Sequence, residues 1–266
     1  MSDLKEKERT LTQILNQAPR LMIAYSGGVD SAVLLWFAVH RSHTEALGVI
    51  ADSPSLKRSE LHEAIQFATS HQLPLQIVQT NELNNPEYQA NPLNRCYFCK
   101  HELFSKMESL AQESKYPVLA YGENLDDIGD HRPGRQAALD FKVIAPLKEA
   151  GLTKSDIRHL ARRENLEVAE KVAQPCLASR LPTGVMVDHD KLQRVEQAEE
   201  FLAALGFQII RVRHFEEKAK VLVSDKEVSR LHEIETAERI INKLLELGFA
   251  EVELSKDPYQ GPSVAV

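Results

Sequence analysis

The sequence is poor in the features that mark membrane and exported proteins. None of its 266 residues belongs to an apolar run that approaches the roughly 18 residues needed to span a membrane as a helix. The first residues, MSDLKEKERTLTQ, lack the apolar core of a secretion signal. Cysteine is scarce, and its odd number, three, argues against a disulfide framework and favours metal-binding or catalytic use. We therefore expect a cytoplasmic protein that does not act at a membrane.

Two common phosphate-binding motifs and an excess of positive charge are also missing. The chain has no Gly-Lys pair, which excludes a Walker P-loop, and no GxGxxG, which excludes the usual dinucleotide loop. Its formal net charge of −7 argues against the broad basic surface on which nucleic-acid binding depends. The charge therefore favours a small molecule over a nucleic acid as the partner.

What the sequence does contain is a regular alternation of short apolar runs and amphipathic stretches. Between the runs, apolar residues recur at the three-to-four spacing of helices that bury one face. This rhythm predicts an α/β fold with a doubly wound parallel sheet in residues 1–172. Residues 173–187 are expected to form a linker loop that carries Cys176, and residues 188–266 a smaller α+β domain. The expected strands of the sheet are residues 21–25, 46–51, 73–79, 116–122 and 142–147.

The segment AYSGGVDS, residues 24–31, lies between the first expected strand and a helix. Its two glycines let an anion approach the backbone, and the helix start offers unpaired N–H groups, so the loop suits phosphate. Its two serines can donate to phosphate oxygens, whereas Asp30 beside a polyphosphate requires a bridging cation such as Mg²⁺. The alternative is an ordinary glycine turn with a Ser or Asp helix cap.

This segment resembles the SGGxDS signature of the PP-loop ATP pyrophosphatases at every signature position. In that superfamily the loop holds the β and γ phosphates of ATP while the α phosphate is attacked, which yields an adenylated substrate and pyrophosphate. The resemblance therefore implies an adenine nucleotide alpha hydrolase-like fold, with ATP and Mg²⁺ as cofactors.

A second polar cluster, in residues 121–134, follows the fourth expected strand. In a doubly wound sheet the ligand crevice lies where the strand order reverses, here between the first and fourth strands. We expect both clusters to face one pocket; the alternative is that the second is a solvated acidic loop. The candidate ATP-binding residues are Ser26, Gly27, Gly28, Asp30, Ser31, Gly122, Asn124 and Asp127.

The cysteines form one close pair and one distant residue. Cys96 and Cys99 make a CxxC at the opening of an expected long helix, and Cys176 lies far downstream. Three thiolates suit a cubane iron–sulfur cluster with one open iron, whereas structural zinc usually takes four ligands, which His101 or another histidine could complete. The alternative for the pair is two buried cysteines that act as small apolar residues.

Six motifs occur in the order and spacing of one enzyme family. They are SGGVDS, NRCYFCK, GENLDDIGDHRPG, GLTKSDIR, PCLASR and RVRH. In these motifs, over nearly the whole chain, the sequence resembles the LarE family of ATP-dependent sulfur-inserting enzymes. The resemblance implies adenylation of a carboxylate of pyridinium-3,5-biscarboxylic acid mononucleotide and its conversion to a thiocarboxylate, in nickel-pincer cofactor biosynthesis. It also implies a homo-oligomer, whereas Gln260 departs from the family, in which an arginine is expected.

The resemblance implies catalytic roles for Asp30 and Cys176. Adenylation turns a carboxylate oxygen into a good leaving group, which a sulfur nucleophile can displace. In relatives with a cysteine only at the position of Cys176, the family pattern implies that this residue gives up its own sulfur. Relatives with all three cysteines hold a four-iron four-sulfur cluster whose open iron binds sulfide. Because this chain has all three, we hypothesise that Cys96, Cys99 and Cys176 ligate such a cluster and that Cys176 is not sacrificed.

Arginine side chains near Cys176 and in the second domain suit the anionic groups of the substrate, because guanidinium forks match phosphate and carboxylate bidentately. The candidate substrate-binding residues are Ser179, Arg180, Arg211 and Arg213, with His214 as a helper. For Arg211 and Arg213 the alternative is a solvated strand face, since alternation puts both on one side. Further candidates, for pyrophosphate or AMP, are Lys100, Arg132 and Lys154.

Three rival functions remain open on the sequence. A PP-loop enzyme that thiolates tRNA also fits the cysteines, although the acidic charge disfavours it. An enzyme that amidates an adenylated carboxylate with ammonia fits the loop but leaves the cysteines unexplained. An ATP-binding regulatory module would use the same fold without turnover.

Overall fold

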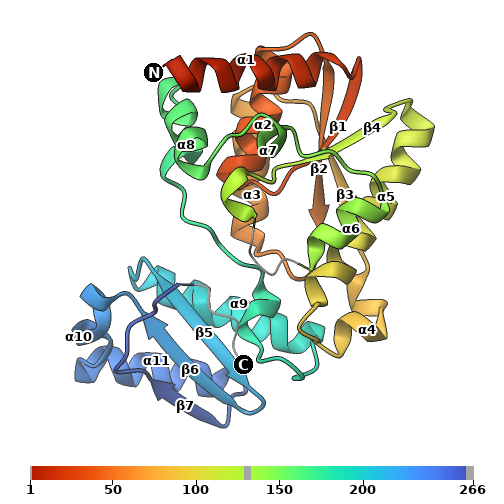
Figure 1. Ribbon diagram of the computed structural model, residues 1–266. Helices are drawn as coiled ribbons and strands as arrows, with labels where there is room; N and C mark the ends of the chain where they lie inside the picture. The colour runs from red at the N-terminus through yellow and green to blue at the C-terminus, as the bar shows by residue number, and fades with distance from the viewer. Residues whose placement is uncertain (1, 129–132, 262–266) are drawn as a thin grey trace. The chain divides into compact units, whose positions relative to one another are not determined.

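The computed structural model describes residues 2–128 and 133–261, and the chain divides into two compact units (Figure 1). Unit 1 comprises Met1–Glu82 and Asn94–Gln174, and unit 2 comprises Leu83–Leu93 and Pro175–Val266. None of the helices in the described part of the chain is long and apolar enough to cross a membrane.

Unit 1 is built on a four-stranded parallel sheet in the order β3-β2-β1-β4. The first strand lies between the second and the fourth, so the strand order reverses at β1 and β4, as the sequence predicts. The strands are β1 (Arg20–Ala24), β2 (Glu45–Asp52), β3 (Leu75–Gln79) and β4 (Val118–Tyr121). The helices of this unit are α1 (Ser2–Asn16), α2 (Val29–His40), α3 (Arg58–Ser70), α5 (Arg95–Ser114), α6 (Gly134–Asp140), α7 (Pro146–Glu149) and α8 (Lys154–Arg163), with 3₁₀ turns η2 (Leu125–Asp127) and η3 (Glu167–Glu170). The 3₁₀ turn η1 (Glu82–Asn84) includes the last residue of the first segment of unit 1 and the first two residues of unit 2.

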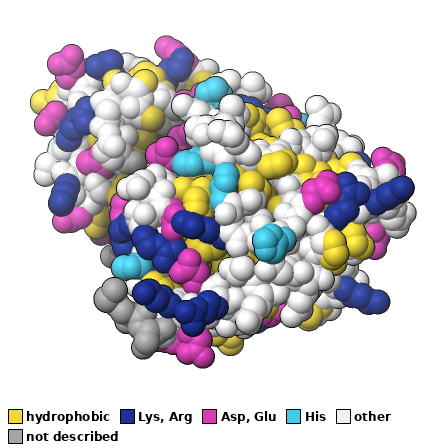
Figure 2. Space-filling model, turned by 90° about the horizontal axis from the view of Figure 1, so that it is seen from above, with side chains coloured by type: hydrophobic (Ala, Val, Ile, Leu, Met, Phe, Trp, Pro, Cys, Tyr) yellow, Lys and Arg dark blue, Asp and Glu magenta, His cyan; other side chains and the backbone are white. Residues whose placement is uncertain are grey.

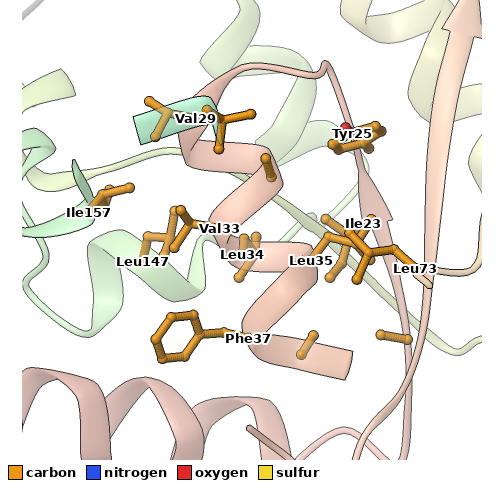
Figure 3. Packing of buried hydrophobic residues seen from close by; sticks show 14 of the residues in the cluster. Ile23, Tyr25, Val29, Val33, Leu34, Leu35, Phe37, Leu73, Leu147 and Ile157 are labelled. Carbon is orange, nitrogen blue, oxygen red and sulfur yellow. The ribbon is translucent and has the colours of Figure 1, made fainter. Parts of the chain in front are cut away.

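Helices cover both faces of this sheet, because alternate residues of β1 point to opposite sides. Leu21 and Ile23 belong to a core formed with residues of α1, α2, α3 and α8, whereas Met22 belongs to a second core formed with α5 and α6. Helix α2 lies in the middle of the first core, with apolar side chains around most of its circumference (Figure 3). The doubly wound α/β fold is confirmed, and its best-buried helix is the one that follows the SGGVDS loop.

The prediction of a fifth strand at residues 142–147 is wrong. Only Ile144 has a strand-like contact, a parallel bridge to Ala120. Pro146 begins the short helix α7 instead. Proline has no N–H to donate to a ladder and fits the first turn of a helix, so the apolar run could not continue as a strand.

Unit 2 contains a mixed three-stranded sheet in the order β5-β6-β7, in which β5 and β6 are antiparallel and β6 and β7 are parallel. Its apolar core joins residues of both long helices, α9 and α11, to the sheet. The α+β architecture agrees with the expectation for this part of the chain. Its elements are η4 (Leu177–Arg180), α9 (His189–Ala204), β5 (Ile210–Phe215), β6 (Lys218–Val223), η5 (Asp225–Glu227), α10 (Val228–Leu231), α11 (Ile234–Glu246) and β7 (Glu251–Leu254), with α4 (Pro86–Gln89) from the earlier segment.

The division between the units differs from the expected boundaries 1–172, 173–187 and 188–266. Residues 83–93 belong to unit 2, although the chain returns to unit 1 after them. Asn91 shows why, because its Nδ2 donates to the carbonyl oxygens of Pro182 at 2.7 Å and Val185 at 2.9 Å. Contacts over such a sequence separation leave no signal in a local pattern.

Candidate functional site

The SGGVDS loop joins β1 to α2 in a conformation that requires glycine. Gly27 has a φ of +72°, and a Cβ placed there would lie 2.6 Å from the Cβ of Ala64 in α3. Gly28 is the N-cap of α2 and provides no side-chain cap. The backbone therefore lies against α3 while the first turn of α2 keeps N–H groups that no capping side chain occupies, which is the geometry that suits an anion.

The two serines of the loop hold it in shape through one small network. The hydroxyl of Ser31 accepts the backbone N–H of Ser26 at 3.1 Å and donates to the carbonyl of Gly28 at 3.1 Å. The hydroxyl of Ser26 lies 3.1 Å from that of Ser31. Ser31 is buried and Ser26 is exposed, so Ser26 is the more accessible of the two donors.

The loop that follows β4 contacts the beginning of α2. A Cβ at Gly122 would lie 2.8 Å from the backbone nitrogen of Ser31, so a side chain at this position would displace one of the two loops. Asn124 comes two residues later, and its Nδ2 donates to Oδ1 of Asp30 at 3.4 Å. The structure thus brings together the two polar clusters that the sequence expects at this edge of the sheet.

Asp30 forms an ion pair at the mouth of the loop. Its Oδ2 accepts a hydrogen bond from Nζ of Lys154 at 2.6 Å. Lys154 is the first residue of α8, and its backbone N–H donates to Asp126 at 2.8 Å. Both charged side chains are only partly buried, so the pair can open when a ligand arrives. Lys154, a further candidate for binding pyrophosphate or AMP, therefore lies next to the SGGVDS loop.

Asp127 differs from the other candidates, because its carboxylate points into its own turn. It accepts the backbone N–H of Asn124 at 3.1 Å and completes a capping box with the Asn124 side chain. Its carboxylate therefore shapes the loop that carries Asn124. Whether Asp127 also contacts ATP stays a prediction.

Glu123 is the centre of a buried charged network beside this loop. Arg135 Nε, Lys148 Nζ and the Tyr121 hydroxyl donate to its carboxylate at 2.6, 2.8 and 2.7 Å. Burial alone raises the pKa of Glu123, but the hydrogen bonds from Lys148, Tyr121 and Arg135 outweigh it and lower the pKa to about 2. These hydrogen bonds fix the Glu123 side chain at the end of β4, and its carboxylate is ionised at neutral pH.

A cavity of about 170 Å³ opens on the loop and is lined by Ser26, Asp30, Ser31, Lys100, Tyr121 and Gly122, among others. The ammonium of Lys100 lies 4.9 Å from the centre of the Tyr121 ring. Lys100 thus places a positive charge on the wall of the cavity, as a polyphosphate requires. Arg132 lies outside the described residues.

The CxxC pair lies on the same helix as Lys100. Cys96 and Cys99 are the second and fifth residues of α5, where Cys96 is exposed and Cys99 is half-buried. Residues four apart share a helix face, so Cys96 and Lys100 lie on one face of α5. The two thiols are therefore within about one helical turn of a residue that lines the loop cavity.

Cys176 belongs to unit 2, where it is half-buried at the start of η4. Arg180, at the other end of that turn, is fully buried, and its guanidinium donates to Glu199 of α9 at 3.0 and 2.9 Å. Ser179 contributes its hydroxyl to the same guanidinium at 3.3 Å. These side chains bind one another around Cys176, and the prediction that Ser179 and Arg180 contact substrate stays a prediction.

Arg211 is a buried arginine with part of its guanidinium unpartnered. Its Nη2 donates to the Tyr259 hydroxyl at 2.8 Å, and the guanidinium carbon lies 4.7 Å from the centre of the Tyr259 ring. Its Nη1 finds no acceptor among the described residues. Burial, and then the charge of Arg180, lower the pKa of Arg211 below its ordinary value. Arg213 is half-buried, two residues along β5 on the same side of the strand.

His214 does not belong to this group, because alternation turns it to the other face of β5. It is completely buried against Phe249, with ring centres 5.0 Å apart, and neither ring nitrogen has a partner within the described residues. Burial, with the charges of Arg194 and Lys191, lowers the pKa of His214 to about 4. The histidine is thus a neutral core residue at pH 7.

The candidate metal groups fit the described residues unequally. Mg²⁺ usually takes one or two carboxylates and completes its shell with phosphate and water, so Asp30 at the loop fits it. For the cluster, no group of three His, Cys, Asp or Glu side chains that could hold a metal occurs within residues 2–128 and 133–261. Two of the cysteines belong to unit 1 and the third to unit 2. The described residues therefore do not support the iron–sulfur cluster.

Sequence reasoning missed three residues that the site depends on. Glu199 looks like one more acid on an amphipathic helix, and Tyr259 lies in an irregular tail, so neither carries a local signal. Glu123 lies in the polar cluster of residues 121–134 that the sequence identifies, but no local pattern predicts its burial between Arg135 and Lys148. Partners this far apart in the chain are revealed only by the fold.

No protein-family model matches the chain. The chain is similar to an uncharacterized protein of Synechocystis sp., with 37% identity over 257 residues that cover 97% of this chain and 96% of the relative. It is 28% identical over 255 residues to the pyridinium-3,5-bisthiocarboxylic acid mononucleotide synthase of Lactiplantibacillus plantarum, covering 96% and 92% of the two chains. A more distant similarity, 24% over 222 residues, covers 75% of this chain and 43% of the glutamine-hydrolyzing GMP synthase of Helicobacter acinonychis.

Proposed function

Because the chain belongs to the LarE family of ATP-dependent sulfur-inserting enzymes, we propose that it converts a carboxylate of pyridinium-3,5-biscarboxylic acid mononucleotide to a thiocarboxylate. The observation that carries the proposal is the SGGVDS loop and its cavity, built from the ends of β1 and β4. The full-length similarity to a synthase of the bisthiocarboxylic acid mononucleotide supports the substrate.

The first half-reaction is adenylation. A substrate carboxylate oxygen attacks the α phosphorus of ATP, a new O–P bond forms, and the bond to the pyrophosphate oxygen breaks. The loop N–H groups and the Ser26 hydroxyl would bind the leaving phosphates, and Lys100 and Lys154 would balance their charge. Asp30 would hold Mg²⁺, which neutralises phosphate charge, and Lys154 would move from the carboxylate to the phosphates.

The second half-reaction replaces AMP by sulfur. A sulfur nucleophile attacks the adenylated carbonyl, a C–S bond forms, and the C–O bond to AMP breaks. We place this sulfur transfer at Cys176. Arg211 Nη1 has no partner among the residues that the structure describes, which supports a role for Arg211 in binding a substrate phosphate or carboxylate, with Arg213 beside it on the strand.

The source of the sulfur divides the proposal into two testable forms. In the form suggested by three cysteines, Cys96, Cys99 and Cys176 hold a four-iron four-sulfur cluster; in the other, Cys176 gives up its own sulfur. Because no metal-binding group is found among residues 2–128 and 133–261, no step here depends on the cluster. Iron and sulfide analysis after anaerobic purification tests the first form. Intact-mass analysis after turnover tests the second, which requires the loss of one sulfur and two hydrogens.

Pyrophosphate release tests the adenylation half. We expect release from ATP only when the biscarboxylate mononucleotide is present, because the carboxylate is the attacking group. Asp30→Asn should lower the rate by about 100-fold without unfolding the protein, whereas Asp140→Asn, at the exposed end of α6, should not change it. Substrate-independent release, or none, would contradict the proposal and favour a binding module.

tRNA thiolation is the second candidate that the test must separate. On the face shown in Figure 2, Lys and Arg side chains are interspersed with Asp and Glu side chains, which favours a small substrate. Gel shifts with bulk tRNA at low salt should show no retardation.

Sedimentation of the protein alone tests the predicted homo-oligomer.

A further inference from the structure

Arg180 uses its guanidinium to hold the backbone on both sides of the Cys176 peptide. Its Nη1 donates to the carbonyl oxygen of Cys176 at 2.9 Å and also to that of Pro175. The Cys176 carbonyl accepts a second hydrogen bond, from the backbone N–H of Ser179, at 2.9 Å. The residue that precedes η4 is therefore held from two directions.

Glu199 fixes the guanidinium in turn. Its two carboxylate oxygens accept Nε and Nη2 of Arg180, and Oε1 also accepts the backbone N–H of Val212 at 3.0 Å. Both charged side chains are fully buried. The chain of contacts thus runs from the backbone of β5, through a carboxylate on α9 and the guanidinium, to the backbone of Cys176.

This arrangement differs from what a substrate-binding arginine would need. The Nε and both terminal nitrogens of Arg180 already donate to protein acceptors, and the side chain is completely buried. Arg211, in contrast, keeps a donor without a partner in the described part of unit 2. A buried ion pair is also weak evidence for stability, since well-packed apolar residues often replace such a pair at little cost.

We propose that Arg180 and Glu199 form a positioning pair that holds the Cys176 backbone in place for sulfur transfer, while Arg180 does not bind substrate. The inference rests on the proposed function for its consequence, although the positioning itself can be measured without turnover. Lysine cannot reproduce it, because a single ammonium lacks the fork that reaches Glu199 and two carbonyl oxygens together.

The test is the rate at which Cys176 is alkylated by iodoacetamide in the full chain, followed by peptide mass mapping. Arg180→Lys keeps the charge but loses the fork, so the freed loop should expose the thiol and raise its alkylation rate at least threefold. Arg230→Lys is the matched control, because Arg230 also donates to two carbonyl oxygens in unit 2, those of Leu205 and Gly206. This control should leave the Cys176 rate unchanged.

A double variant separates positioning from folding. Arg180→Met with Glu199→Leu removes both buried charges. The double variant should therefore fold, with a melting temperature close to that of the wild-type protein, but iodoacetamide should alkylate its Cys176 faster. In both Arg180 variants thiocarboxylate formation should fall at least tenfold, with the substrate KM unchanged and pyrophosphate release intact. Cys176 alkylation and thiocarboxylate formation that stay within twofold in folded variants would overturn the inference, as would a rise confined to the substrate KM. Loss of substrate-dependent pyrophosphate release in the unchanged protein would instead overturn the proposed function.

Discussion

At the scale of single residues, the loop depends most clearly on Gly27. Its positive φ disfavours any other residue, and the Cβ of Ala64 occupies the space that a side chain would need. Gly151 has nearly the same φ, +71°, but no atom of the described residues lies within 4 Å of the position a Cβ would take. Substitution of the two glycines in unit 1 therefore separates the cost of backbone strain from the cost of steric crowding.

Gly151→Ala should lower the free energy of unfolding by about 1 kcal/mol, from backbone strain alone. Gly27→Ala should lower it by about 3 kcal/mol, because the strain is joined by overpacking against α3. Urea unfolding followed by circular dichroism measures both. Equal losses in the two variants would show that α3 yields to the added methyl group.

At the scale of elements, α9 and β5 enclose a histidine that cannot stay neutral in the unfolded chain at mildly acidic pH. The folded pKa of His214 is about 4, below its ordinary value of 6.5. Between these values the unfolded state binds more protons, so stability rises with pH. The charged groups that act on the ring are Asp188, the N-cap of α9, which opposes the shift, and Lys191 and Arg194 of α9, which increase it.

We expect the free energy of unfolding of unit 2 to fall by about 2 kcal/mol between pH 7 and pH 5 on account of His214. His214→Phe should remove this part of the pH dependence, whereas His189→Gln, an exposed residue on the same helix, should keep it. Urea titrations at the two pH values measure the difference. If the free energy of unfolding of His214→Phe depends on pH as strongly as that of the wild-type protein, His214 does not contribute to this pH dependence.

At the scale of the whole molecule, the proposed chemistry is divided between the two units. The residues that line the cavity at the SGGVDS loop belong to unit 1, whereas Cys176, Arg180 and Arg211 belong to unit 2. Adenylation and sulfur transfer should therefore respond to different substitutions.

Cys176→Ala should leave substrate-dependent pyrophosphate release within about threefold of the unchanged protein while abolishing thiocarboxylate formation, because only the second step uses the thiol. Mass spectrometry of the product and a coupled pyrophosphate assay measure the two steps on one sample. A proportional loss of both activities would show that Cys176 takes part in adenylation as well.

Most of the strands and the SGGVDS loop could be predicted from the sequence alone. Alternation and helical spacing identify β1 to β4 and the α+β character of residues 188–266, because burial on one face leaves a period in the chain. The order β3-β2-β1-β4 follows the general rules of doubly wound sheets, so the meeting of Gly122 with Ser31 could be expected. The same reasoning failed at residues 142–147, where a proline ended an apolar run.

The pairing of charged side chains could not be predicted before the fold was known. Lys154 pairs with Asp30 across 124 residues, Arg180 with Glu199 across 19, and residues 83–93 pack with unit 2 rather than with their neighbours in the chain. Local patterns report burial and backbone preference, both properties of short segments, whereas an ion pair depends on the distance between two side chains. For this reason the sequence could indicate Arg180 as important, and only the fold could show it holding Cys176.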